Sequence, residues 1–91
     1  MYASIIQHPK FSGIFDNYFL TYPRLDDVLA DIDWNLAREP RQGAVIEDSC
    51  RVYKTNPTPD TPSFWILYEY DEALNQVTLL SMRPVPKLPE F

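Results

Sequence analysis

The segment SFWILYEY, residues Ser63–Tyr70, has the alternating pattern of an extended strand. Successive side chains on a β-strand point to opposite faces. The side chains that share a face are Phe64, Ile66, Tyr68 and Tyr70 on one side, and Trp65, Leu67 and Glu69 on the other. Because both sets are largely apolar, the segment is predicted to be an interior strand with both faces at least partly covered.

Three further strands are predicted around this segment, because β-branched and apolar residues recur between turn signals. They are Ala44–Glu47, Cys50–Thr55 and Gln76–Arg83. The loop Asn56–Pro62 (NPTPDTP) holds three prolines and is expected to be a stiff, exposed connection. Asp71–Asn75 is short enough to join the last two strands as a hairpin. Together these segments predict a mostly antiparallel sheet.

The chain before Gly43 is predicted to form a short strand followed by two helices. Tyr2–Gln7 has strand character, and apolar residues then recur every three or four positions, which is the spacing of one helical face. The helices are expected at about Lys10–Thr21 and Leu25–Arg38, separated by Pro23, which suits the first turn of a new helix. The predicted fold class is therefore α+β, with two amphipathic helices packed on one face of a small, mostly antiparallel sheet.

The composition predicts one small domain that is stabilised by packing alone. The 91 residues carry 8 basic and 13 acidic side chains, for a net charge of −5, and 45% of them are hydrophobic. One cysteine, Cys50, and one histidine, His8, provide neither an internal disulfide nor a His/Cys metal cage, and no metal or cofactor is expected. Residues 1–83 are expected to form the domain, and residues 84–91, rich in proline, an extended tail.

Charge and hydropathy also limit the partners of the chain. No apolar run approaches the roughly 18 to 20 residues that cross a bilayer, so no membrane partner is expected and a cytoplasmic location is predicted. The acidic balance disfavours direct, tight binding of naked nucleic acid, because such binding depends on Lys and Arg contacts to phosphate.

Four segments together resemble the RelE/ParE superfamily of small bacterial toxins of type II toxin-antitoxin systems. The segments are LDDVLADIDWNLAREP (Leu25–Pro40) followed by Gly43, CRVYK (Cys50–Lys54), FWILYEYD (Phe64–Asp71) and VTLLSMR (Val77–Arg83). The resemblance is one of pattern and covers most of the chain. It implies the family's short first strand, helical pair and antiparallel sheet with basic residues, and it implies an antitoxin protein as a partner.

The resemblance also implies an activity. The ribonuclease branch of the family cuts mRNA in the ribosomal A site, so the ribosome with its mRNA is an implied partner. Basic side chains there stabilise the phosphate in the transition state. The implied catalytic contacts of this endoribonuclease (mRNA interferase) are Arg83, Arg51 and Lys54.

Two alternatives to translation inhibition by mRNA cleavage follow from the same residues. One is a non-catalytic family member that binds a protein target, either DNA gyrase in the manner of the ParE branch or only its antitoxin. The other is an unrelated α+β interaction domain, which would be favoured if the last strand did not lie beside Ser63–Tyr70.

The chain departs from the pattern of the active ribonucleases. Those proteins are usually basic and carry Tyr or His near the C-terminus as a general acid or base, whereas only Lys87 and Glu90 are titratable after Arg83 in this chain. Arg51 and Lys54 are three residues apart, so a regular strand directs them to opposite faces. The loss of some of the basic residues found in the active ribonucleases would fit the gyrase-binding branch equally well.

Trp34 is the remaining candidate for partner binding. At 100° per residue it lies opposite the apolar stripe of the second predicted helix, so it packs under the proline-rich tail or a neighbouring loop, or anchors a partner.

Other polar residues are expected to have structural roles. His8 is expected at the entry of the first helix, and Cys50 to be a small buried hydrophobe. The carboxylates of the second helix do not have the spacing of a metal site and are expected on a solvated surface, with Asp27 and Asp31 on one face and Asp26 and Asp33 on another.

Overall fold

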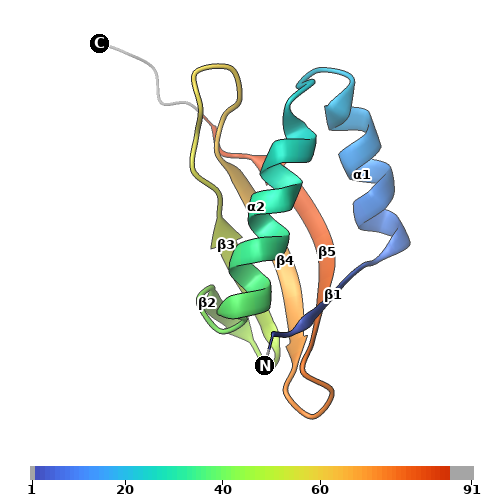
Figure 1. Cartoon of the computed structure of the whole chain (residues 1–91), viewed down its shortest axis with the longest axis vertical. Helices are drawn as coiled ribbons and strands as arrows, with labels where there is room; N and C mark the ends of the chain where they lie inside the picture. Colours follow the sequence, from blue (N-terminus) through green and yellow to red (C-terminus); the bar gives the residue numbers. More distant parts are fainter. Residues whose placement is uncertain (1, 87–91) are drawn as a thin grey trace.

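The computed structural model of the chain describes residues 2–86 and contains two helices and a five-stranded sheet (Figure 1). In chain order the elements are β1 (Ser4–Gln7), α1 (Pro9–Phe19), α2 (Leu25–Arg38), β2 (Ala44–Glu47), β3 (Cys50–Lys54), β4 (Phe64–Asp71) and β5 (Gln76–Pro84). The strand order is β1-β5-β4-β3-β2; β1 is parallel to β5, and the other neighbours are antiparallel. The predicted α+β class is confirmed. Because β5 lies beside β4, the condition that would favour an unrelated interaction domain is not met.

Local hydrogen bonds set the two ends of α1. His8 caps α1, since its Nδ1 accepts a hydrogen bond from the Lys10 backbone N–H at 3.0 Å, and Pro9 occupies the first turn. The helix ends at Phe19, two residues before the expected position, because the backbone N–H groups of residues 21 and 22 both bond to the carbonyl of Tyr18. The bounds of α2 are those predicted from the sequence.

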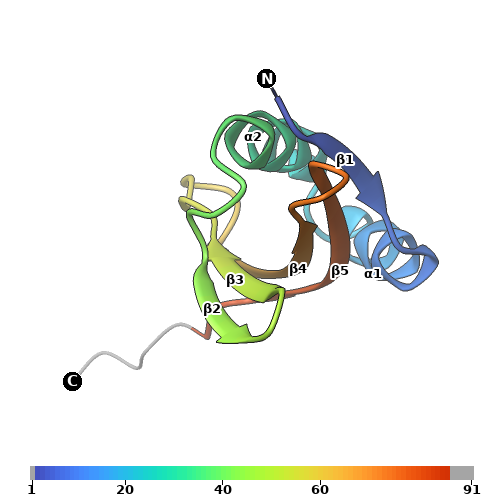
Figure 2. The ribbon, with the colours of Figure 1, turned by 90° about the horizontal axis from the view of Figure 1, so that it is seen from below.

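Both helices cover the same face of the sheet. Figure 1 shows α2 crossing in front of the middle of the sheet and α1 running beside β5, and Figure 2 shows the same arrangement from below. Alternate residues of β4 and β5 meet the apolar stripes of the helices in one buried core. Its fully buried members are Phe11, Leu25, Ile32, Leu36, Phe64, Ile66, Tyr68, Val77 and Leu79. The rings of Tyr18 and Tyr22 pack edge-on against Phe64, with centroids 5.6 and 5.7 Å away.

The connection from α2 to β2 is attached to this core through Tyr68. The Tyr68 hydroxyl donates a hydrogen bond to the Pro40 carbonyl at 2.8 Å and accepts one from the Gly43 N–H at 3.0 Å. A Cβ at position 43 would lie 2.7 Å from both the Tyr68 hydroxyl and the Val52 carbonyl oxygen, so only glycine fits there.

A β-bulge in β5 changes the faces on which the end of the chain lies. Tyr68 pairs with Leu79, but the preceding residue, Leu67, pairs with Ser81, so Leu80 is an extra residue in β5. Beyond the bulge, Met82 faces the helices and Arg83 faces the other side of the sheet. Without the extra residue, these two side chains would lie on the opposite faces.

The bounds of β2 are those predicted, and the other four strands differ from the predicted ones by one or two residues at one or both ends. β1 begins at Ser4, because the Ala3 N–H bonds to the carbonyl of residue 37 in α2 and not to a strand. Pro84 pairs with Phe64 and ends β5, and the Val85 N–H bonds to the Ser63 carbonyl, so the sheet extends into the predicted tail. Residues 87–91 of that tail, with Lys87 and Glu90, lie outside the described residues. In the described part of the chain, neither helix has the length and apolar character of a membrane span.

Candidate functional site on the open face of the sheet

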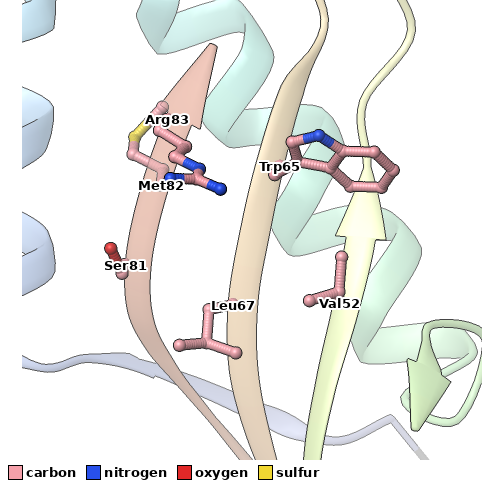
Figure 3. A pocket seen from close by; sticks show the side chains of 6 residues that line it. All are labelled: Val52, Trp65, Leu67, Ser81, Met82 and Arg83. Carbon is pink, nitrogen blue, oxygen red and sulfur yellow. The ribbon is translucent and has the colours of Figure 1, made fainter. Parts of the chain in front are cut away.

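A hollow lies on the face of the sheet that the helices leave open. It has a volume of about 400 Å³ and is lined by Val52 from β3, Trp65 and Leu67 from β4, and residues 81–83 of β5. Figure 3 shows the Trp65 ring extending over β3, the Arg83 side chain extending toward β4, and Leu67 and Val52 between them and the lower part of the sheet. The hollow therefore has an apolar floor with an aromatic ring on one side and a cation on the other.

The strand register aligns the polar groups of this face in rows. Lys54 pairs with Trp65, and Trp65 pairs with Arg83, so one row across three strands reads cation, indole, cation. The next row consists of residues 52, 67 and 81, whose side chains are Val, Leu and Ser. The charged row lies at the end of the sheet where β5 ends.

Among residues 2–86, no carboxylate forms an ion pair with either cation of the charged row. The Lys54 Nζ lies 5.7 Å from the centroid of the Trp65 ring, and Trp65 is 37% exposed. Within residues 2–86, the side chains of Lys54 and Arg83 form no hydrogen bond or ion pair; the one ion pair found there joins Arg41 to Glu72 at 2.9 Å. As far as residues 2–86 are concerned, Lys54 and Arg83 are available to an anionic ligand.

Arg51, the third predicted contact, is not part of this row. It pairs with the buried Tyr68 and so lies on the helix-covered face, opposite to Lys54, as expected for residues three apart. Its guanidinium donates hydrogen bonds to the carbonyls of Arg41 and Gly43 at 2.9 and 2.8 Å. The structure therefore unites two of the three predicted cations and gives Arg51 a role in fixing the connection between α2 and β2.

Cys50 and Glu69 pair with each other further along the open face. Burial raises the pKa of the Cys50 thiol, and the carboxylates of Glu69, Glu47 and Asp48 raise it further. The thiol is consequently held in its neutral form, which is a poor nucleophile. Cys50 is only half-buried, so the expectation that it is a small buried hydrophobe is wrong.

Trp34 lies on the outer side of α2, away from the hollow. It is 58% exposed, its ring centroid is 6.4 Å from that of Tyr2, and the Arg38 guanidinium lies 5.2 Å from the ring. The aromatic neighbour of Trp34 is therefore Tyr2, which lies near the start of the chain. The predicted tail is at the opposite end of the sequence.

Asp33 differs from the prediction of a solvated helix surface. Its Oδ1 is buried without a hydrogen-bond partner among the described residues, and burial raises the pKa of its carboxyl above the ordinary value of 3.8. The residue follows Ile32 on the side of α2 that is adjacent to the core stripe, so part of the carboxyl is shielded from water.

Trp65 is the binding candidate that sequence analysis missed. The alternation of β4 places it on the second face of the strand, but its two cationic neighbours depend on the register across the loop 55–63 and on the bulge at Leu80. With this geometry the row can bind phosphate oxygens through its cations and stack a planar base on the indole.

No protein-family model matches the chain, and no curated protein matches it in sequence. A chain of the toxin-antitoxin complex RelBE2 from Mycobacterium tuberculosis is similar in structure, with a TM-score of 0.69 over 93% of this chain and 100% of that chain. The sequence identity is 13%, so the likeness concerns the fold. This protein has the RelE-like α+β fold that the sequence pattern predicts.

Proposed function

We propose that this protein is the toxin of a type II toxin-antitoxin pair and that it cleaves mRNA on the ribosome. The observation that supports the activity is the charged row of the open face, in which Lys54 and Arg83 flank the exposed Trp65 and have no carboxylate partner within residues 2–86. The RelE-like fold and its similarity to a chain of a toxin-antitoxin complex support the class.

The charges of the row suit a phosphodiester that is attacked by its neighbouring 2′-hydroxyl. Negative charge develops on the phosphate oxygens in that transition state, and fixed cations stabilise it. In this proposal Arg83 contacts these oxygens with its planar fork of N–H donors, and Lys54 contributes a second positive charge. Trp65 stacks against a base of the same strand and holds the phosphate in position.

A net charge of −5 suits a ribosome-dependent activity. An acidic chain attracts free RNA weakly, because affinity for nucleic acid comes mainly from phosphate neutralisation. The ribosome holds the mRNA in place, so the toxin needs only a local cationic row to act on it. The proposed location is accordingly the cytoplasm.

The test is mRNA cleavage in a translating system with the purified chain and with Arg83→Ala, mapping 5′ ends on the message. Cuts within codons that require ribosomes and are lost in Arg83→Ala would support the proposal. Lys10→Ala, which removes an exposed cation of α1 whose side chain has no hydrogen bond or ion pair in the described residues, is the matched control and should cut like the wild type. No cuts from a folded wild-type chain would refute the ribonuclease activity.

The binding of an antitoxin is expected to use Trp34. Its exposed ring, with Tyr2 and Arg38 beside it, has the aromatic and arginine character of residues that dominate interface energies. Once an antitoxin is identified from its gene neighbourhood, Trp34→Ala should weaken the complex more than tenfold. An unchanged affinity would exclude Trp34 as the anchor.

One observation favours a second candidate function. Because the Arg51 guanidinium is bound to backbone carbonyls, the open face has fewer free cations than the sequence pattern implies. A non-catalytic family member that binds DNA gyrase, or only its antitoxin, needs no cluster of cations. If the cleavage assay is negative, pull-down of gyrase and of the antitoxin by the same protein distinguishes these two cases.

A further inference from the structure

The open face of the sheet carries a second row of polar side chains, at the opposite end from the charged row. Glu47 pairs with Cys50, and Cys50 pairs with Glu69, so this row across β2, β3 and β4 consists of a carboxylate, a thiol and a carboxylate. After burial, Glu69 and Glu47 contribute most to the raised pKa of the Cys50 thiol, so both charges lie close to it. These three residues form the acidic row.

A mainly apolar middle row separates the charged row from the acidic row. It consists of Val52, Leu67 and Ser81, whose side chains are half-buried. Neighbouring residues on one face of a strand are about 6.8 Å apart, so the charged row and the acidic row lie about 13 Å apart. Figure 2 shows both helices on the other face of the sheet, so neither helix covers these three rows.

The charges at the two ends of this face have no ionic partner within the described part of the chain. Lys54 and Arg83 at one end, and Glu47 and Glu69 at the other, are exposed and form no ion pair within residues 2–86. These four charges cancel one another, although the whole chain has a net charge of −5. The open face therefore has a cationic end and an anionic end of equal charge, with apolar side chains between them.

This arrangement is complementary to itself under a two-fold rotation. A two-fold axis along the middle row brings a second copy face to face with the first, with its strands antiparallel, so that the same residues form both halves of the contact. The charged row of each copy then lies over the acidic row of the other. Lys54 faces Cys50 of the second copy, between the two carboxylates of that row, and Arg83 lies one strand away from Glu69 of the second copy. A two-fold axis along the strands would instead oppose like charges.

We propose that two copies of this chain associate through their open faces, about the two-fold axis along the middle row. A second copy has the required order of charges by symmetry. Lysine, arginine and glutamate side chains from the two copies together span the distance of about 10 Å between packed sheets. The contact covers Val52 and Leu67 and buries the Trp65 ring, which is 37% exposed in the single chain. The negative charge of the chain opposes self-association in general, but on this face opposite charges meet.

The dimer would cover the candidate RNA site. Lys54, Trp65 and Arg83 lie in the contact, so a chain within the dimer could not bind RNA through the charged row. Cleavage of mRNA would then require the dimer to dissociate. This consequence rests on the proposed function, whereas the dimer itself rests only on the geometry of the open face. Because the dimer is measured without RNA, failure of one proposal is distinguishable from failure of the other.

The test is sedimentation velocity of the purified full chain, with a charge reversal in each of the two outer rows. Because three rows of three residues form a small interface, we expect a reversible dimer that becomes populated between about 10 μM and 1 mM. Arg83→Glu alone and Glu69→Arg alone each bring like charges together at both halves of the contact, so each should weaken the dimer about tenfold or more. In an equimolar mixture of the two variants, opposite charges meet again at both halves. A mixed dimer should therefore form about tenfold more tightly than the dimer of either variant alone.

A matched control separates this face from the charge of the chain as a whole. Asp16→Arg makes the same charge reversal on the exposed surface of α1 and should dimerise like the wild type. The melting temperatures of Arg83→Glu and Glu69→Arg should remain close to that of the wild type, because both replaced side chains are exposed. A chain that stays monomeric up to about 1 mM would overturn the proposal. A dimer that neither reversal weakens, or a mixture that associates no more tightly than its separate components, would also overturn it.

Discussion

The two faces of the central sheet differ in what their side chains do, although the same strands supply both. On the helix-covered face, Phe64, Ile66 and Tyr68 of β4 have no exposed surface. On the open face, Trp65 alternates with these residues and remains more than one-third exposed between two cations. The difference shows that strand alternation encloses one face of the sheet in the core and leaves the other open, where the proposed contacts to RNA lie.

The largest expected effect is the loss of a core aromatic. Phe64→Ala should lower the free energy of unfolding by about 3–5 kcal/mol, because it leaves a cavity beneath Tyr18 and Tyr22. The adjacent Trp65→Ala should lower it by about 1 kcal/mol, because its ring is only partly buried. Urea denaturation of the two variants measures the contrast, and equal losses would contradict the division between the faces.

A smaller effect is expected from the Tyr68 hydroxyl. Tyr68→Phe should cost about 2 kcal/mol, because the Gly43 N–H and the Pro40 carbonyl both lose their partner near the core. Tyr70→Phe, which removes a half-buried hydrogen bond to Asn75, is the control and should cost under about 1 kcal/mol. Thermal unfolding compares them, and a larger loss in Tyr70→Phe would show that the connection is held by other contacts.

Replacing each of the two cations of β3 with alanine should affect stability and activity differently. Arg51→Ala should cost about 1 kcal/mol, since its guanidinium bonds to two carbonyls, whereas Lys54→Ala should stay within about 0.5 kcal/mol of the wild type. In the ribosome-dependent cleavage assay the order should reverse, with the greater loss of cuts in Lys54→Ala. A greater loss of cuts in Arg51→Ala than in Lys54→Ala would instead place Arg51 among the contacts to RNA.

The smallest effect is expected from the carboxyl group of Asp33, which lies next to the apolar stripe of α2. Burial raises the pKa of Asp33, so the ionised form destabilises the folded state, and this penalty is present above the folded pKa and disappears as the pH falls below it. Asp33→Asn should raise the free energy of unfolding at pH 7 by at most about 1 kcal/mol. The advantage should shrink toward pH 3. An advantage that did not depend on pH would assign the effect to packing.

The sequence predicts the elements of this fold because each carries its own period. The apolar spacing of Leu25–Arg38 and the alternation of Ser63–Tyr70 are local signals, and the structure confirms both segments within one residue. The sequence also indicates that Arg51 and Lys54 face opposite ways, since that follows from spacing within one strand.

The charged row could not be predicted, because it depends on pairing between strands. The register that pairs Lys54 with Trp65 cannot be deduced from the sequence across the loop Asn56–Pro62. If residue pairs of β4 and β5 are assigned outward from the hairpin without a bulge, Trp65 pairs with Met82, and Arg83 points toward the helices. Leu80 is apolar like its neighbours, so nothing in the local pattern marks it as the extra residue.

The bulge at Leu80 also has a consequence for how such a site could arise. In a gene the extra residue is a single codon, and its in-frame loss or gain would exchange the sides on which Met82 and Arg83 lie. A lineage could therefore gain or lose the charged row in one mutational step, without replacing any amino acid in it. Relatives of this chain with the same residues but one fewer in the last strand should, by this logic, have a different surface chemistry on an unchanged fold.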